Sequence, residues 1–267
     1  MKLDEEDDDY QRMLHMMKTE EAKKSPDMDK IYATVNNIER EDYIKRNPTY
    51  KPPNHENPAD KDRAMVLHAF PTSMFALDLD LSDEEIATYV TVVKDNLKSS
   101  MGGSFEQTKG NLHQIDVMKP LVKKFRKAVA KIIDEEIWWE YDDFRINQMW
   151  GNSYEKNKMI PMHTHPNQHL TGVFFLESDQ SQGVTIFFEP NPAKNCFDVP
   201  FRSNRASMAY AKSVTVEGHK NRMVLFPSYL GHCSEPNRSS KPRITISFNI
   251  TINEPLGLKQ ELTYVGE

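Results

Sequence analysis

The feature that most constrains the fold is a change in sequence period after Glu140. Before it, apolar residues recur every three to four positions, as in helices; after it, short apolar runs alternate with turn residues, as in strands. The runs that we expect to form strands span 144–150, 159–163, 170–177, 184–189, 213–216, 223–226 and 243–252. This many short strands predicts an antiparallel sandwich or barrel.

Two helices are predicted before these strands. The first, at about 82–99, begins with Ser82 and has Glu85 three residues later, which is a capping-box pattern. The second, at about 117–139, has one apolar stripe opposite a Lys/Arg face. Among the later strands, LTGVFFL and TIFF are apolar on both faces, so they need cover on both sides. We therefore expect a mainly β fold with flanking helices (α+β), in which the strands form a jelly roll.

Charge divides the chain into two parts. Residues 1–65 hold 16 Asp/Glu and 12 Lys/Arg, and they end in a proline-broken stretch at 47–62. We interpret 1–65 as a tail and linker, partly helical or disordered, and 66–267 as the folded domain. Tyr10, Leu14 and Met17 recur at helical spacing within the tail. Such a face could bind a protein partner.

Several classes of protein are disfavoured by composition. The net charge of -6 does not provide the cationic field that nucleic acids or anionic membranes attract. No run approaches the roughly 20 apolar residues of a membrane span, and the acidic start differs from a signal peptide. Neither cysteine lies in a C-x-x-C pair, so both are expected to be ordinary thiols. We predict a cytoplasmic protein that binds neither nucleic acid nor membrane.

Three of the nine histidines lie within seven residues, at His163, His165 and His169. Residues at i and i+2 of a strand point to the same face, so two of these imidazoles could converge on one metal ion. The alternative is a histidine-rich surface loop that binds nothing.

A second polar group follows in the sequence. His232 comes after an apolar run and a Phe-Pro turn, and Arg243 opens a strand eleven residues later. In that strand Arg243, Thr245 and Ser247 share one face. A buried Arg must be paired with an anion, and no Asp or Glu is close to it in sequence, so a carboxylate ligand is an attractive partner. The alternative is a surface strand whose Arg contacts solvent.

Together these segments resemble a known family. HTHPNQHLTGVFFL, LFPSYLGHCSEPN and RITISFN are similar to the Fe(II)- and 2-oxoglutarate-dependent oxygenases, and more narrowly to an oxygenase group from bacteria and their phages. The resemblance covers about 144–252. It implies a double-stranded β-helix, Fe(II) as cofactor and 2-oxoglutarate as cosubstrate. It also implies oxidation, as by a hydroxylase, of a peptide or small molecule, with release of succinate and CO2, in the cytoplasm of a bacterium or an infected host cell.

The resemblance implies an iron site made by His163, His165 and His232, with no catalytic residue beyond these ligands. The family has Asp or Glu where this chain has His165, so the site is one charge more positive than usual. His169 is expected to contact a ligand residue or the substrate. The carboxylates that could instead complete the site, if the fold turns them inward, are Glu177, Asp179 and Glu189.

The resemblance also implies a cosubstrate site. Arg243 would bind the far carboxylate of 2-oxoglutarate through a bidentate fork, helped by Thr245 and Ser247. We expect Tyr154 to lie in a loop at the mouth of the site, and a lid to come from 191–212. Apolar residues expected to wall the site are Val173, Phe175, Ile186 and Phe188.

Two other functions fit the same fold. Cupins also have an H-x-H pair and a distant histidine, here His163, His165 and His232 with His169 as a further ligand, and they act without 2-oxoglutarate. That interpretation gives Arg243 no role. A non-catalytic jelly roll that serves as a structural or interaction protein is the other alternative.

Overall fold

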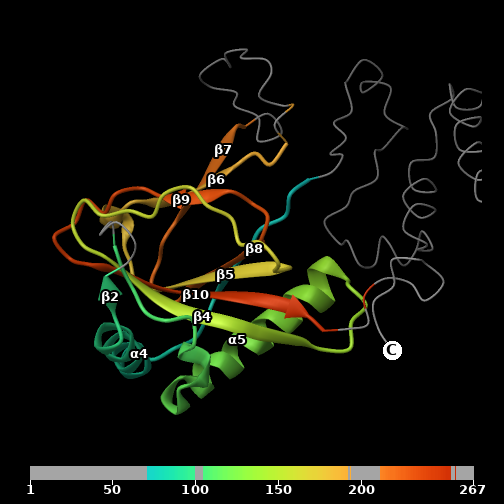
Figure 1. The fold of residues 1–267 in the computed structure, drawn as a ribbon, viewed down its shortest axis with the longest axis horizontal. Coiled ribbons are helices and arrows are strands. Elements are labelled where there is room, and N and C mark those ends of the chain that lie inside the picture. The colour runs from blue at the N-terminus through green and yellow to red at the C-terminus, as the bar shows by residue number, and fades with distance from the viewer. Residues whose placement is uncertain (1–70, 100–104, 192, 194–210, 254–255, 257–267) are drawn as a thin grey trace, which may run out of the picture. The chain divides into compact units, whose positions relative to one another are not determined.

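The computed structural model describes residues 71–99, 105–191, 193, 211–253 and 256 (Figure 1). They belong to a compact unit that spans residues 68–267. The predicted tail at 1–65 lies outside the described residues, as does nearly all of the expected lid. Their roles remain predictions.

The strands of the described residues form two antiparallel sheets. The larger sheet has the order β1-β8-β5-β10-β4-β3-β2. Its strands are β1 (Phe75–Asp78), β2 (Lys98–Ser99), β3 (Glu106–Gln107), β4 (Phe144–Tyr154), β5 (Leu170–Glu177), β8 (Arg222–Pro227) and β10 (Arg243–Ile252). The smaller sheet has the order β7-β6-β9, with β6 (Val184–Phe188), β7 (Ser213–Glu217) and β9 (His232–Ser234).

The two sheets meet through an apolar cluster. Phe175 of β5 and Phe226 of β8 pack with Phe187, which comes from β6 in the smaller sheet. Figure 1 shows β6, β7 and β9 on one side of the larger sheet and the helices on the other. This arrangement confirms the predicted mainly β fold with flanking helices, a double-stranded β-helix or jelly roll.

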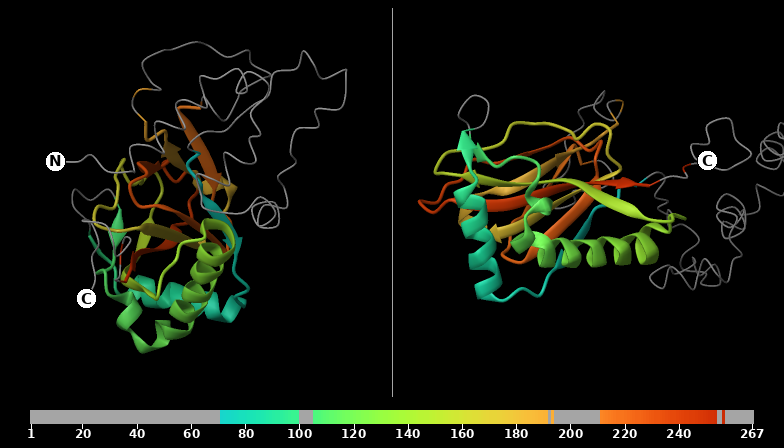
Figure 2. Two further views of the ribbon diagram at one scale, coloured as in Figure 1. Left: turned by 90° about the vertical axis from the view of Figure 1, so that its right-hand side faces the viewer. Right: turned by 60° about the horizontal axis from the view of Figure 1, so that its bottom comes forward.

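Two helices cover the outer face of the larger sheet (Figure 2). Helix α4 (Asp83–Asp95) begins with the predicted capping box, in which Ser82 and Glu85 exchange hydrogen bonds. Helix α5 (Lys119–Ile132) continues into a π-helical turn, η5 (Ile133–Ile137), and Trp138 then adopts a left-handed φ of 60° that ends it. Both helices therefore end slightly earlier than predicted. Short 3-10 turns are η3 (Leu112–Gln114), η4 (Asp116–Met118) and η6 (Gln180–Gln182).

Strand β10 lies between β4 and β5 and is buried on both faces. One face presents Ile244, Ile246 and Phe248 to the helices, and all three are fully buried. The opposite face presents Arg243 and Thr245 to the smaller sheet's side, together with other polar residues. The predicted alternation of polar and apolar residues along this strand is present. The strand lies in the interior, so the alternative that it is a surface strand with a solvent-exposed Arg243 is wrong.

One predicted strand is wrong. The segment 159–163 is a loop, and its only bridge among the described residues is between His163 and His232. Pro161 lies in its middle and has no N–H to donate to a strand ladder. The loop is nevertheless held to β9, because His163 and His232 exchange two backbone hydrogen bonds of 3.0 Å.

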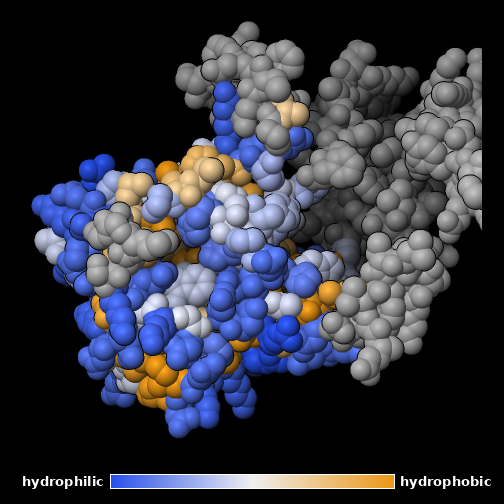
Figure 3. Space-filling view, in the orientation of Figure 1, coloured by the Kyte–Doolittle hydropathy of each residue, from blue (hydrophilic) through white to orange (hydrophobic). Residues whose placement is uncertain are grey.

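The surface shown in Figure 3 is mostly hydrophilic and has scattered apolar patches. Large apolar side chains exposed among the described residues are Val117, Trp139, Met162 and Tyr229. Of the helices in the described part of the chain, none is long and apolar enough to cross a membrane.

Gly172 of β5 is required by close packing. A Cβ atom at this position would lie 2.1 Å from the Phe248 ring, which itself stacks on Phe125 of α5 at a centroid distance of 4.4 Å. We predict that Gly172→Ala lowers the free energy of unfolding by about 1–3 kcal/mol, the usual cost of overpacking a core. Gly231→Ala is the control, because no described atom beyond its chain neighbours lies within 4 Å of the place that its new methyl group would take. Equal denaturation midpoints for the two variants would contradict this account.

Candidate active site

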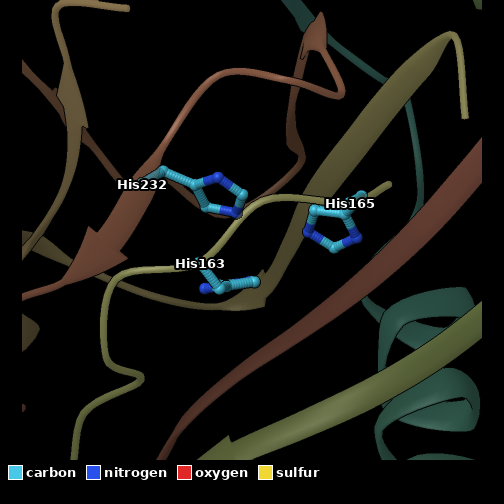
Figure 4. A group of neighbouring side chains, drawn as sticks. All are labelled: His163, His165 and His232. Carbon is cyan, nitrogen blue, oxygen red and sulfur yellow. The ribbon is translucent and has the colours of Figure 1, made fainter. Parts of the chain in front are cut away.

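Three imidazoles meet where the β4–β5 loop runs beside β9 (Figure 4). Ring centroids are 4.3 Å apart for His163 and His232, 5.0 Å for His163 and His165, and 5.2 Å for His165 and His232. One ring nitrogen from each lies within 4.8 Å of the others, and no other group of at least three His, Cys, Asp or Glu with this geometry occurs among the described residues. The structure therefore brings together the three residues proposed as ligands.

The outer nitrogens of two of these rings are fixed by backbone carbonyls. The Nδ1 of His163 lies 2.9 Å from the Pro161 oxygen, and the Nδ1 of His232 lies 2.9 Å from the Leu230 oxygen. Because a carbonyl only accepts, each Nδ1 carries the proton and each Nε2 retains a free lone pair. Such hydrogen bonds to the second nitrogen are typical of metal-binding histidines.

Burial keeps the cluster neutral. Burial, together with the nearby His232 and His163, lowers the pKa of His165 to about 3, and burial lowers that of His232 to about 4. The pKa of His163 is also lowered by burial. The His165 Nε2 atom is buried without a hydrogen-bond partner. A neutral, unpartnered nitrogen that faces two others fits a divalent metal ion of the first transition series.

The described carboxylates do not join this cluster. Glu177 forms an ion pair with Lys94 at 3.8 Å, and Asp179 accepts a 2.8 Å hydrogen bond from the Ser181 backbone. Glu189 accepts one from the backbone of Asn191 at 3.0 Å. The fold therefore does not turn these side chains toward the histidines, and the donor set is nitrogen alone.

His169 has a different position. Its Nδ1 accepts a 3.2 Å hydrogen bond from the Ile252 backbone, and its ring meets the Trp139 ring edge to face at 6.3 Å. It is also absent from the lining of the cavity beside the histidines. The contacts of His169 are those of a residue that holds the start of β5 to the end of β10.

Arg243 opens β10 and lines the same cavity as the three histidines, with only 2% of its surface exposed. Its guanidinium donates to the backbone oxygens of Gln182 at 2.9 Å and of Gly183 and Glu235 at 3.4 Å. It lies over the Tyr154 ring at 4.7 Å. No described Asp or Glu forms an ion pair with it, although the Glu235 carboxylate attracts its charge from a greater distance. Its positive charge can therefore still attract an anionic ligand in the cavity.

Two hydroxyls lie farther along the same face of β10. Thr245 and Ser247 accept hydrogen bonds from the Asn152 amide at 3.3 and 3.2 Å. Asn152 is fixed in turn by Gln107, whose amide donates to it at 3.0 Å. Thr245 also hydrogen-bonds to the Tyr154 phenol, which lowers the pKa of that phenol and so makes the Thr245 hydroxyl the donor.

The prediction that Tyr154 lies in a loop is wrong. Strand β4 extends four residues beyond its predicted end, because the polar sequence after Trp150 pairs with β10 as far as Arg243. Tyr154 is thus buried against that guanidinium, and burial raises the pKa of its phenol to about 12. The phenol remains neutral at physiological pH.

On β6, the apolar residue that faces the histidines is one position away from those predicted. Val173 and Phe175 line the cavity as predicted, but Ile186 and Phe188 do not. Phe187 points inward instead, with its ring 5.7 Å from the His232 ring. Successive strand residues point to opposite faces, and a run apolar at every position does not indicate which face is inside. The cavity has a volume of about 130 Å³.

Comparison with known proteins agrees with this geometry. Residues 148–249 match the family model described as "Putative 2OG-Fe(II) oxygenase". No curated protein matches the sequence at a significant level. For this part of the chain, the match agrees with the resemblance to the Fe(II)- and 2-oxoglutarate-dependent oxygenases. The resemblance stated from the sequence is confirmed.

Three solved structures with a similar fold are compared with this chain. The non-heme alpha-ketoglutarate-dependent epimerase SnoN from nogalamycin biosynthesis is 14% identical, with 68% of this chain and 79% of that chain covered and a TM-score of 0.50. HygX from Streptomyces hygroscopicus, with nickel, 2-oxoglutarate and hygromycin B, is 11% identical (68% and 83% covered, TM-score 0.49). A viral collagen prolyl hydroxylase from Paramecium Bursaria Chlorella virus-1 is 13% identical (68% and 96% covered, TM-score 0.47). At such identities the likeness to SnoN supports the fold alone.

The low pKa values predict how stability depends on pH. The unfolded chain protonates its histidines below about pH 6.5, whereas the folded state keeps His165 and His232 neutral down to about pH 3 and 4. The unfolded state then binds more protons, so stability falls as pH falls. We expect metal-free protein to lose free energy of unfolding between pH 7 and 5, as measured by chemical denaturation. A His165→Gln/His232→Gln variant should show a shallower slope, and an unchanged slope would contradict the assignment.

Proposed function

We propose that the protein is an Fe(II)- and 2-oxoglutarate-dependent dioxygenase that hydroxylates a small molecule or a peptide. His163, His165 and His232 would hold the iron, and Arg243 would bind the cosubstrate. The observation that supports this most directly is that a buried guanidinium without a carboxylate partner among the described residues lines the same cavity as three converging imidazoles. We place the reaction in the cytoplasm, as expected from the sequence.

The iron, when bound with 2-oxoglutarate and dioxygen, supplies the oxidation, and succinate and CO2 are released. The protein's own groups bind and orient. Arg243 would pair with the far carboxylate, and the hydroxyls of Thr245 and Ser247 would help to hold the same ligand. Phe175 and Phe187 would exclude water from the metal side of the cavity.

The lack of a carboxylate in the described cluster favours a second candidate, a cupin-like metalloenzyme that does not use 2-oxoglutarate. The two candidates differ in what they require of Arg243. A buried, unpaired guanidinium is costly to keep in a fold, and only the oxygenase gives it an anion to bind. A non-catalytic jelly roll would require neither the histidine cluster nor this charge.

The first experiment tests cosubstrate binding. Anaerobic addition of Fe(II) and 2-oxoglutarate to wild-type protein should produce a visible metal-to-ligand charge-transfer band. Arg243→Gln should weaken 2-oxoglutarate binding by at least tenfold, because a charge-assisted hydrogen bond of about 1.5–3 kcal/mol is removed. Arg222→Gln is the matched control, since Arg222 pairs with Asp78 at a partly exposed site on β8. If wild-type protein gives no band, the 2-oxoglutarate proposal fails; if Arg243→Gln titrates like the control, the role of Arg243 fails.

A second experiment tests the unusual ligand. His165→Ala should abolish tight Fe(II) binding, because two imidazoles alone would remain from the described cluster. His165→Asp should bind Fe(II) more tightly than wild-type protein, because it restores an anionic ligand at that position. Both affinities can be measured by competition with a chelating dye. Wild-type affinity in both variants would mean that another group is the ligand.

A further inference from the structure

The outer nitrogen of His165 is held differently from those of its two neighbours. His163 and His232 donate to backbone carbonyls, whereas His165 hydrogen-bonds to the side chain of Asn249 on β10. Its Nε2 is the buried nitrogen without a partner, so Nδ1 is the atom that meets Asn249. Figure 4 agrees, because one ring nitrogen of His165 faces the other two imidazoles and the second faces away. The orientation of one proposed ligand thus depends on a replaceable side chain.

The Asn249 amide is itself fixed in orientation. Its Nδ2 donates to Gln148 Oε1 at 2.8 Å, and its Oδ1 accepts from Thr171 Oγ1 at 3.1 Å. Thr171 also hydrogen-bonds to Ser228 Oγ at 2.8 Å, and the Ser228 carbonyl accepts the backbone N–H of His165 at 2.9 Å. These contacts form a closed ring that returns to His165. Thr171 and Ser228 are fully buried, and Asn249 is 4% exposed.

This orientation determines which proton His165 carries. The amide nitrogen is engaged with Gln148, so the oxygen of Asn249 is the atom presented to the imidazole. An oxygen acceptor requires a protonated Nδ1, which leaves the lone pair on Nε2. The ring is also stacked on Trp150 at a centroid distance of 5.5 Å, which limits its rotation. All three imidazoles then present Nε2 to the same point.

We propose that Asn249 is a positioning residue that fixes His165 as the Nδ1–H tautomer, with Nε2 as the metal-binding atom. This inference rests on the proposed metal site and assigns to Asn249 no contact with the metal or the substrate. It explains how a histidine can stand in the place of a carboxylate ligand. An imidazole must be held in one tautomer as well as one orientation, and the side chain on β10 does both.

The test compares metal affinities, with Zn(II) alone as the probe and a chelating dye as competitor. Asn249→Leu should weaken Zn(II) binding by about 10- to 100-fold, the usual effect of losing such a partner. Asn249→Asp should restore it, because a carboxylate oxygen accepts from the same Nδ1–H. Asn147→Leu is the matched control, since Asn147 bonds to Gln168 and Thr251 rather than to a proposed ligand. Affinity of Asn249→Leu within twofold of that control would overturn the inference.

A second measurement needs no variant. In metal-free wild-type protein at pH 7, 15N NMR should show His165 with a protonated Nδ1 and an unprotonated Nε2. A protonated Nε2 would overturn the inference even if Asn249→Leu failed to fold. The two proposals fail separately. Wild-type protein that binds no Zn(II) or Fe(II) contradicts the metal site, whereas tight binding with the opposite tautomer contradicts only the role of Asn249.

Discussion

Strand β10 sets the constraint on which the site depends. It is buried on both faces, and only one of them is apolar. The residues of its polar face, all of them buried, are Arg243, Thr245, Ser247 and Asn249. Each polar atom placed there must find a partner inside the protein or in a ligand, because burial without one costs about 1–3 kcal/mol or more. Arg243, Thr245 and Ser247 of this face line the cavity.

The neutral residues of this face and Arg243 differ in how completely the protein satisfies them. Thr245 and Ser247 are held by Asn152, and Asn249 by Thr171 and Gln148, so these neutral groups are satisfied within the fold. Arg243 donates to backbone carbonyls but forms no ion pair with a described carboxylate, and Glu235 attracts its charge only from a greater distance. Protein contacts satisfy hydrogen bonds here without neutralising the cation. The remaining requirement is electrostatic, and the proposed anionic cosubstrate would meet it.

Sequence period predicted most of this architecture and part of the site. Alternation gave the faces of β10, the capping box gave the start of α4, and the spacing of His163 and His165 indicated convergence. The prediction failed on β6, where the apolar residues are consecutive. Such a run does not show which residues face the interior, so Phe187 could not be distinguished from Ile186 as the inward-facing residue. The pairing of His165 with Asn249 depends on how the β4–β5 loop lies across β10. Nothing in the local sequence of either residue indicates it.

The histidine cluster and Arg243 are related through their charges. Three neutral imidazoles would leave the full charge of the proposed divalent ion uncompensated, and Arg243 adds another positive charge in the same cavity. The proposed role of Asn249 does not reduce this positive charge, because a neutral amide would orient His165 without the negative charge that an Asp would bring. A doubly negative dicarboxylate is attracted by both ends of such a cavity, and the low dielectric of the interior strengthens both attractions. Metal and cosubstrate should therefore each raise the other's affinity, since by linkage their coupling is reciprocal.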